Sequence, residues 1–278
     1  MNLLRLLRVK ILSQTFLNIT VYSSSGIMSR KICIYGLEGI PEVKPGDDLP
    51  KLIVEAAERS NVGLMDDDIV VVSQKIVSKA ENRIVRLREI TPSDFAINLA
   101  EAEGKDPRLV EVILREAKRI VRVRDGHIIT ETRHGFVCAN SGVDKSNIPG
   151  DDTVSLLPID PDESARRIRE RIREIKGVDV AVIVSDTFGR AWRIGQVNFA
   201  VGVAGMMPIT DYRGLNDPYG YTLKVTAIAV ADELAAAAEL VMGKLSKIPV
   251  AIIRGFKPIR GEGSAKDLVR PIERDLFR

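Results

Sequence analysis

The sequence predicts a mixed α/β fold, an α+β arrangement with central mixed sheets and helices packed against them. Three short apolar runs rich in β-branched residues are typical of strands buried on both faces: Ile69–Val72, Val180–Val184 and Ile248–Ile253. Between these runs lie segments in which apolar residues recur every three or four positions, the spacing of amphipathic helices. A chain of 278 residues that mixes both patterns is long enough to bury a sizeable core.

The N-terminal part of the chain is expected to form two strands, three helices and a hairpin. The strands are Lys31–Tyr35 and Asp68–Val77, and the helices are Leu49–Ser60, Pro92–Glu103 and Pro107–Ile120. Thr91 and Asp106 each precede a proline, which predicts that they cap the second and third helices. Partial alternation around Asp125-Gly126 predicts a hairpin over Val121–Thr132.

The best-marked helix lies directly before the central apolar run. Asp160 is its expected cap, Pro161 opens it, Glu163 completes a capping box and Gly177 ends it. Its arginines alternate with glutamates, which indicates a solvated face with helix-spaced ion pairs and not a patch for nucleic acid. The strand Val180–Val184 follows and is expected to stop at Ser185-Asp186-Thr187.

The C-terminal part is expected to add two strands and one long helix. The strands are Val197–Gly205 and Ile248–Ile253, and the helix is Leu223–Met242, ended by Gly243. This helix is alanine-rich and apolar on most sides, which predicts deep packing. Its Asp232-Glu233 pair is interpreted as two structural acids with partners.

Composition restricts the class of protein. The net charge is +3, and residues 1–27, which hold three basic side chains and no acid, account for all of it. The remainder is neutral overall, so no electrostatic footprint for nucleic acid exists. No long uncharged run suits a membrane span, and two unpaired cysteines predict reduced thiols in a cytoplasm. Residues 1–27 are expected to be a dispensable extension, with Met28 as the true first residue and 28–278 as one functional domain.

Several familiar catalytic motifs are absent from the sequence. It has no phosphate-binding P-loop, no glycine-rich dinucleotide motif after a strand and no nucleophile elbow. Two cysteines and two histidines make a structural zinc site a poor expectation. Chemistry that needs no side-chain nucleophile is therefore favoured.

Oxygen ligands are the side chains that remain. Asp144 and Asp186 each end a β-like run, with Asn147 and Thr187 beside them. Hard oxygen ligands favour Mg²⁺ or Mn²⁺, and in proteins these ions usually bind together with phosphates. Four basic residues beside similar strand ends are candidates to meet phosphate oxygens: Lys75, Lys79, Arg190 and Arg193.

Five short blocks, in order along the chain, resemble the coenzyme F420 γ-glutamyl ligases. They are Gly36–Pro41, Ser73–Glu81, Asn140–Asn147, Ser185–Arg190 and Val230–Glu233, within a resemblance that runs from Lys31 to about Gly263. The resemblance implies two intertwined subdomains and an intimate homodimer. It also implies a ligase that uses GTP and a divalent metal to join L-glutamate to the phospholactyl carboxylate of a deazaflavin precursor, and then adds a γ-linked glutamate.

The same resemblance implies a role for particular residues. Asp144 and Asp186 would be catalytic, and together with Thr187 they would hold Mg²⁺ or Mn²⁺, with K⁺ as a further candidate ion. GTP would be contacted by twelve residues: Ile40, Pro41, Glu42, Val43, Gln74, Lys75, Lys79, Asn147, Met242, Gly243, Lys244 and Ile248. The last four belong to a nucleotide loop that would run from Met242 to Ile248 after the long helix.

One position departs from the family pattern. Many members resembling this chain read Met-Gly-Glu, with the acid as a further metal ligand, where this chain reads Met242-Gly243-Lys244. An ammonium group cannot ligate a cation. Either a second metal is held differently, or Lys244 itself meets a phosphate.

The chemistry of a ligase fits the absence of a nucleophile. A carboxylate is a poor electrophile, so amide formation requires activation, and transfer of the γ-phosphoryl group would give an acyl phosphate. Two rivals stay open: a metal-dependent phosphatase on the same carboxylates, and a nucleotide-binding protein without catalysis.

Overall fold

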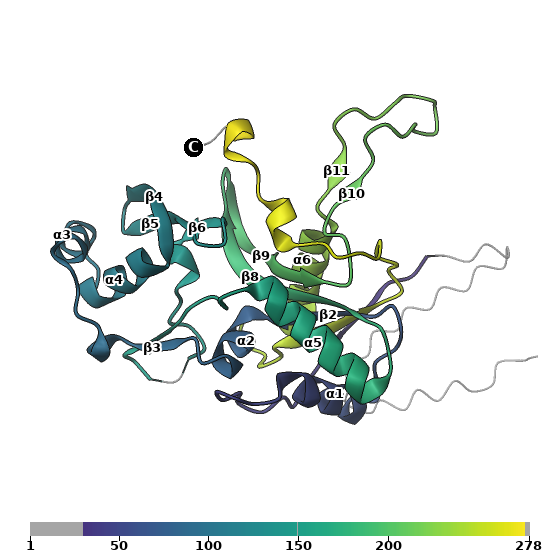
Figure 1. Cartoon of the computed structure of the whole chain (residues 1–278), viewed down its shortest axis with the longest axis horizontal. Coiled ribbons are helices and arrows are strands. Elements are labelled where there is room, and N and C mark those ends of the chain that lie inside the picture. Colours follow the sequence, from purple (N-terminus) through teal and green to yellow (C-terminus); the bar gives the residue numbers. More distant parts are fainter. Residues whose placement is uncertain (1–29, 149, 276–278) are drawn as a thin grey trace, which may run out of the picture. The chain divides into compact units, whose positions relative to one another are not determined.

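The computed structural model describes residues 30–148 and 150–275, and contacts group the chain from Lys31 onward into one compact unit (Figure 1). The expectations about residues 1–27 and about Met28 as the first residue lie outside the described residues. The predicted mixed α/β class is confirmed, because helices cover a central mixed sheet.

The central sheet has five strands in the order β1-β12-β2-β8-β9. β2 and β8 run parallel, and the other neighbouring strands run antiparallel. The apolar residues of β2, of β12 and of the first half of β8 are almost fully buried, as their unbroken β-branched runs predict. The strands are β1 (Cys33–Gly36), β2 (Ile69–Ser73), β8 (Ala181–Arg190), β9 (Arg193–Ala204) and β12 (Val250–Arg254).

Helices on both faces of the sheet explain this burial. α1 (Leu49–Arg59) and α5 (Pro161–Lys176) pack together on one face, and α6 (Val230–Met242) contacts the sheet from the other (Figure 1). The caps predicted for α5 are confirmed: Asp160 accepts from the backbone N–H of Glu163 at 3.0 Å, and Gly177 takes the left-handed conformation. The predicted capping box is wrong, because the Glu163 carboxylate accepts from Arg166 instead.

A second hydrophobic core lies between residues 84 and 156. Leu87, Val110, Ile113, Ile128 and Val154 are fully buried at its centre. Its elements are β3 (Ile84–Arg86), a 3₁₀ turn (Leu87–Glu89), α3 (Asp94–Glu103), α4 (Pro107–Glu116), β4 (Ala117–Arg124), β5 (His127–Thr132), β6 (Val137–Ala139) and β7 (Thr153–Ser155). β4 and β5 form the predicted hairpin around Asp125-Gly126.

Several predicted boundaries in this half are wrong. The strand Asp68–Val77 ends at Ser73, where the chain turns into the short helix α2 (Gln74–Ala80). The helix expected to reach Ile120 ends at Glu116 and continues as β4. Asp106 caps α4 as predicted, whereas the side chain of Ser93, and not Thr91, caps α3. At β4, pairing with β5 overrides the local helical pattern.

The prediction that β8 stops at Ser185-Asp186-Thr187 is also wrong. β8 continues to Arg190 and returns as β9, with a register shift between Val184 and Ser185. A shift of this kind changes the direction in which the following side chains point.

The predicted structural role of Asp232 is confirmed, because the backbone N–H of Ala200 donates to Asp232 Oδ1 at 2.9 Å.

The C-terminal part follows the prediction in outline. α6 begins at Val230 and not at Leu223, because residues 210–228 leave the sheet as a long excursion based on β10 (Thr210–Asp211) and β11 (Ala227–Ile228). Gly243 caps the end of α6 as expected. Two further 3₁₀ turns follow β12: Ala265–Leu268 and Ile272–Arg274.

Two compositional expectations can be compared with the described chain. Cys33 and Cys138 both carry free thiols, as predicted. Within residues 30–148 and 150–275, every helix is too short or too polar to cross a membrane.

Candidate functional site

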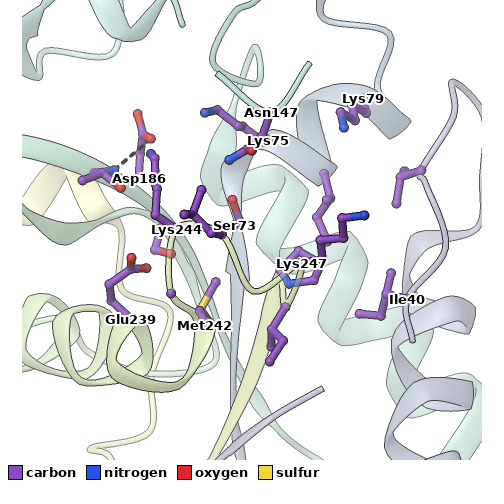
Figure 2. Close-up of a pocket in the computed structure, with 18 of the residues that line it drawn as sticks. Ile40, Ser73, Lys75, Lys79, Asn147, Asp186, Glu239, Met242, Lys244 and Lys247 are labelled. Carbon is purple, nitrogen blue, oxygen red and sulfur yellow. Dashed lines mark hydrogen bonds between the residues drawn. The ribbon is translucent and has the colours of Figure 1, made fainter. Parts of the chain in front are cut away.

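A pocket of about 670 Å³ opens at one edge of the central sheet (Figure 2). Its lining comes from the end of β2 with α2, from β8 and β9, and from the end of α6 with the loop that follows. The turn at residues 40–43 and the segment at 147–148 complete it. Residues that are far apart in sequence are thus collected where the sheet ends.

The parallel pair of strands explains the position of the pocket. Ser73 of β2 and Ser185 of β8 are the last register partners of this pair, and both line the pocket. In α/β sheets, ligands bind beyond the carboxyl ends of parallel strands. Asp186 and Thr187 follow directly, and three successive residues of β8 line the same pocket beside the register shift.

One side of the pocket, here called the lysine wall, consists of Lys75 and Lys79 on α2. Both side chains are largely buried and both already hold a carboxylate. Lys75 Nζ lies 2.6 Å from Asp144 Oδ2, and Lys79 Nζ lies 2.5 Å from Glu42 Oε1. Burial on its own raises the pKa of Asp144, but the Lys75 ammonium and the donors of Ser146 outweigh it and hold that pKa below its ordinary value. The positive charges of this wall are therefore matched in the unliganded protein.

The opposite side, here called the acid wall, consists of Asp186, Thr187, Asn198 and Glu239. Asp186 Oδ1 accepts the backbone N–H of Thr187 at 2.8 Å. Burial raises the pKa of Asp186 to about 6, against the opposing effects of that N–H and of the Lys75 ammonium. The Thr187 hydroxyl donates to Asn198 Oδ1 at 2.8 Å, and Asn198 Nδ2 donates to Glu239 Oε2 at 3.0 Å. This wall carries negative charge without a paired cation among its own residues.

The loop after α6 brings two further ammonium groups to the pocket. Gly243 ends the helix with a φ of 57°, a conformation that favours glycine, and a Cβ there would lie 2.7 Å from Ser246 Oγ. Lys244 and Lys247 follow and line the pocket. Figure 2 shows Lys244 extending toward Asp186, and its charge opposes the rise in the pKa of that carboxyl group.

Most of the predicted site residues meet in this one pocket. Gln74 is fully buried behind it, where its Oε1 accepts from Ser78. Asp144 lies behind the Lys75 ammonium and is not among the lining residues. The predicted residues that do line the pocket are Ile40, Pro41, Glu42, Val43, Lys75, Lys79, Asn147, Asp186, Thr187, Met242, Gly243, Lys244 and Ile248.

Two predicted phosphate contacts are not part of the pocket. Arg190 lies at the far end of β8, where its guanidinium donates to the carbonyl oxygens of Ile194 and Gly195. Arg193 begins β9 beside it and is exposed. The prediction that both arginines lie beside the strand end that carries Asp186 is wrong. β8 continues past Asp186 to Arg190, so both arginines lie away from the pocket.

Sequence reasoning missed several lining residues, of which Asn198 and Glu239 carry the most chemistry. Asn198 is 4% exposed within an otherwise apolar run, and a buried polar side chain in such a run was the available signal. Glu239 lay in a helix that was interpreted as packing alone. Leu245 and Lys247 fall within the predicted nucleotide loop from Met242 to Ile248. The other missed residues are Ser73, Ile76, Ile148, Ser185 and Pro249.

The donor set of the pocket suits a hard cation. Across the described residues, no group of three or more His, Cys, Asp and Glu side chains forms a ready-made metal centre. The oxygens of the acid wall are instead the carboxylates of Asp186 and Glu239, the hydroxyl of Thr187 and the amide of Asn198. Ser185 Oγ is also buried at this edge and has no hydrogen-bond partner in the described part of the chain. Oxygen donors of this kind fit Mg²⁺ or Mn²⁺ better than zinc.

Comparison with known proteins identifies the family of this chain. A sequence model of the family described as F420-0:Gamma-glutamyl ligase matches residues 39–255. A Methanothermobacter thermautotrophicus protein named Coenzyme F420:L-glutamate ligase is 50% identical over 250 residues, which cover 89% of this chain and 99% of the relative. Proteins of the same name from Methanopyrus kandleri and Methanocaldococcus jannaschii are 50% and 46% identical, over 87% and 90% of this chain and 97% and 98% of their own lengths. The chain belongs to the F420-0:Gamma-glutamyl ligase family.

Proposed function

We propose that the protein is a GTP- and divalent-metal-dependent ligase. It joins L-glutamate to the phospholactyl carboxylate of a deazaflavin coenzyme F420 precursor and then adds a γ-linked glutamate. Family membership and the names of the relatives support the substrates. The observation that carries the proposal is a single pocket with ammonium groups on one side and an unpaired carboxylate on the other.

The residues present fit a divalent cation beside Asp186. Its buried carboxylate has a raised pKa, which a cation at bonding distance would reverse. Thr187 supplies a neighbouring oxygen, and Asp144 would join once Lys75 released it. A bound Mg²⁺ or Mn²⁺ would neutralise charge on the phosphoryl group during transfer.

The ammonium groups of the pocket suit the phosphates of GTP. Lys75 and Lys79 each hold an exchangeable carboxylate, and Lys244 and Lys247 come from the glycine-ended loop after α6. Of the two alternatives for Lys244, contact with a phosphate is favoured over a second metal held by other residues, because an ammonium group donates to phosphate oxygens and cannot ligate a metal.

The reaction follows from how these groups hold the reactants. The lysines orient the nucleotide so that its γ-phosphoryl group faces the acceptor carboxylate, and transfer gives an acyl phosphate and GDP. The glutamate amine then attacks the acyl carbon, and phosphate leaves. The direct attack of the amine requires no side-chain nucleophile. Buried apolar residues of the pocket lining, such as Val43 and Met242, help to exclude water from the activated carboxyl group.

A homodimer in the cytoplasm completes the proposal. Ile194 at the tip of the β8–β9 hairpin is fully exposed, and Tyr219 and Val225 in the excursion between β10 and β11 are 96% and 87% exposed. Large apolar side chains with this exposure favour burial in a partner subunit. Light scattering is expected to report a dimer, and a monomer at working concentration would contradict this part.

Incubation with the deazaflavin acceptor, L-glutamate, GTP and MnCl₂, followed by mass spectrometry, tests the proposed reaction. The expected products carry one and then two added glutamyl units, with one GDP formed for each. ATP in place of GTP serves as the control for nucleotide choice. Phosphate release that is independent of acceptor and glutamate would instead support the phosphatase, and nucleotide binding without any turnover would support a protein without catalysis.

A further inference from the structure

Three side chains of the acid wall form a hydrogen-bonded chain whose direction can be deduced. Thr187 and Asn198 are register partners on β8 and β9, and Glu239 reaches them from α6. Thr187 Oγ1 lies 2.8 Å from Asn198 Oδ1, and Asn198 Nδ2 lies 3.0 Å from Glu239 Oε2. All three residues line the pocket.

The carboxylate of Glu239 fixes the orientation of the amide. An ionised carboxylate has no proton to give and only accepts, so Asn198 must turn its NH₂ group toward Glu239. The amide oxygen of Asn198 then faces Thr187. The opposite orientation would place two acceptors against each other at a side chain that is 4% exposed, where water does not compensate for the loss.

The amide in turn fixes the proton of the threonine hydroxyl. An amide oxygen only accepts, so the single proton of Thr187 Oγ1 must point at Asn198. Only the lone pairs of that oxygen then remain for the pocket. An oxygen in this state can bind a cation or accept from an ammonium group, but it cannot donate to a phosphate oxygen.

We propose that Glu239 and Asn198 are positioning residues that lock the Thr187 hydroxyl as an acceptor, so that the acid wall takes a cation and rejects a phosphate oxygen at this point. The inference rests on the proposed use of a divalent metal. The inference gives a role in metal binding to Asn198 on β9 and Glu239 on α6, whereas Asp186 and Thr187 lie on β8.

Manganese binding tests the inference without turnover. Mn²⁺ is titrated into the full chain, without nucleotide or glutamate, and free Mn²⁺ is measured by electron paramagnetic resonance. Glu239→Gln removes the obligatory acceptor, so the amide and then the hydroxyl can reverse. The expected result is binding about tenfold weaker, the loss typical of groups that orient metal ligands. Glu233→Gln, an exposed change on the same helix, is the control and should leave binding unchanged.

A double-mutant cycle separates positioning from direct action. Thr187→Val removes the hydroxyl, and in that background Glu239→Gln should weaken Mn²⁺ binding no further. A loss of the same size in both backgrounds would mean that Glu239 acts through its own charge, and would overturn the inference. If a variant fails to melt like the wild type, Asn198→Ala breaks the chain from its centre and should give the same dependence on Thr187.

These measurements distinguish failure of the positioning role of Glu239 and Asn198 from failure of the proposed ligase activity. Glutamate ligation that is measured in the wild type, together with an additive cycle, would overturn the positioning role alone. A wild type that binds Mn²⁺ with a non-additive cycle, yet ligates no glutamate, would overturn the ligase and retain the positioning role. A wild type that binds no Mn²⁺ without nucleotide would overturn the positioning role, and the glutamate ligation assay with GTP would decide the ligase separately.

Discussion

The two walls of the pocket solve the problem of buried charge differently. On the lysine wall, Lys75 and Lys79 each hold a carboxylate within 2.6 Å, and both of those carboxylates are partly exposed to solvent. On the acid wall, Asp186 accepts one backbone N–H, and burial raises its pKa to about 6. Burying a charge without a partner costs several kcal/mol, so the second arrangement is stable only when something else compensates for it.

The difference indicates how each wall meets a ligand. A phosphate that reaches the lysine wall replaces a carboxylate that is already there, so binding is an exchange of partners. A cation that reaches the acid wall meets Asp186, a carboxylate that forms no ion pair in the described residues, although the charges of Lys75 and Lys244 oppose the rise in its pKa. Four predictions, from the largest effect to the smallest, separate these two modes.

Asp186→Asn should have the largest effect. It preserves the shape of the side chain and removes the charge, so metal-dependent ligation should fall by about a thousandfold. Thermal melting without metal should stay the same or rise, because an uncompensated carboxylate is lost. Activity and melting are to be measured on one sample. A variant that melts lower yet remains active would end the metal-site hypothesis.

The matched control for this change is Asp211→Asn. Asp211 is an exposed acid outside the pocket, and its neighbour Arg213 lowers its pKa to about 2. The control should leave ligation intact. It therefore shows whether loss of a carboxylate anywhere in the chain is sufficient to impair the enzyme.

Lys75→Met should have the second largest effect, from the opposite wall. Loss of a charged donor to phosphate should weaken binding of a non-hydrolysable GTP analogue by roughly ten- to a hundredfold. Burial would then dominate at Asp144, so the pKa of that carboxyl group should rise instead of staying low. Calorimetry measures the affinity, and Lys51→Met on the exposed side of α1 is the control. An unchanged affinity would remove Lys75 from the nucleotide site.

How far the sequence predicted each part of the molecule depends on how local the cause is. Strands made of unbroken β-branched residues, such as Val70–Val72, and a helix with its own caps, such as α5, were predicted because neighbouring residues determine them. The extension of β8 to Arg190 was not, because pairing with β9 holds those polar residues in a strand. The helix α2 was missed because its apolar residues Ile76 and Val77 directly continue the apolar run of β2.

The residues of the site also divide into those that the local sequence predicts and those that only the fold brings together. Asp186, Thr187 and the lysines of α2 lie beside the ends of apolar runs, where the sequence already indicated oxygen and phosphate chemistry. Asn198 and Glu239 come from an antiparallel strand and from a helix that the sequence places 41 residues apart. Only the fold brings them together, so their joint action on Thr187 has no local signal.

Glu42→Gln should have a smaller effect, and in the direction of tighter binding. The Glu42 carboxylate holds Lys79 while its own side chain is 61% exposed, so it competes weakly with an incoming phosphate. Removing its charge should raise the affinity for the GTP analogue about threefold, since exposed ion pairs contribute up to about 1 kcal/mol. Glu38→Gln, an exposed change near the same turn, is the control. Weaker binding in the Glu42 variant would show that this carboxylate contacts the nucleotide directly.

Asp232→Asn should have the smallest effect and tests whether a raised pKa by itself marks a functional acid. Like Asp186, Asp232 accepts one backbone N–H, and burial raises its pKa, but it does not line the pocket. A carboxyl group with a raised pKa stabilises the fold at low pH, and that contribution is lost as pH rises through the folded-state value. The asparagine keeps the acceptor for Ala200 and does not titrate. Its free energy of unfolding should therefore exceed that of the wild type by an amount that grows as pH rises above the ordinary pKa of an aspartate and then levels off.

Urea unfolding at a series of pH values measures this difference, and Glu233→Gln, the exposed neighbour on α6, should show no comparable pH trend. Ligation should be unchanged in both variants, because neither side chain reaches the pocket. If Asp232→Asn were instead to lose activity as Asp186→Asn does, desolvation alone would not distinguish the two acids. The acid wall would then have to include Asp232 in the first turn of α6, behind β9. The two walls would in that case differ in how far they reach into the protein as well as in the sign of their charge.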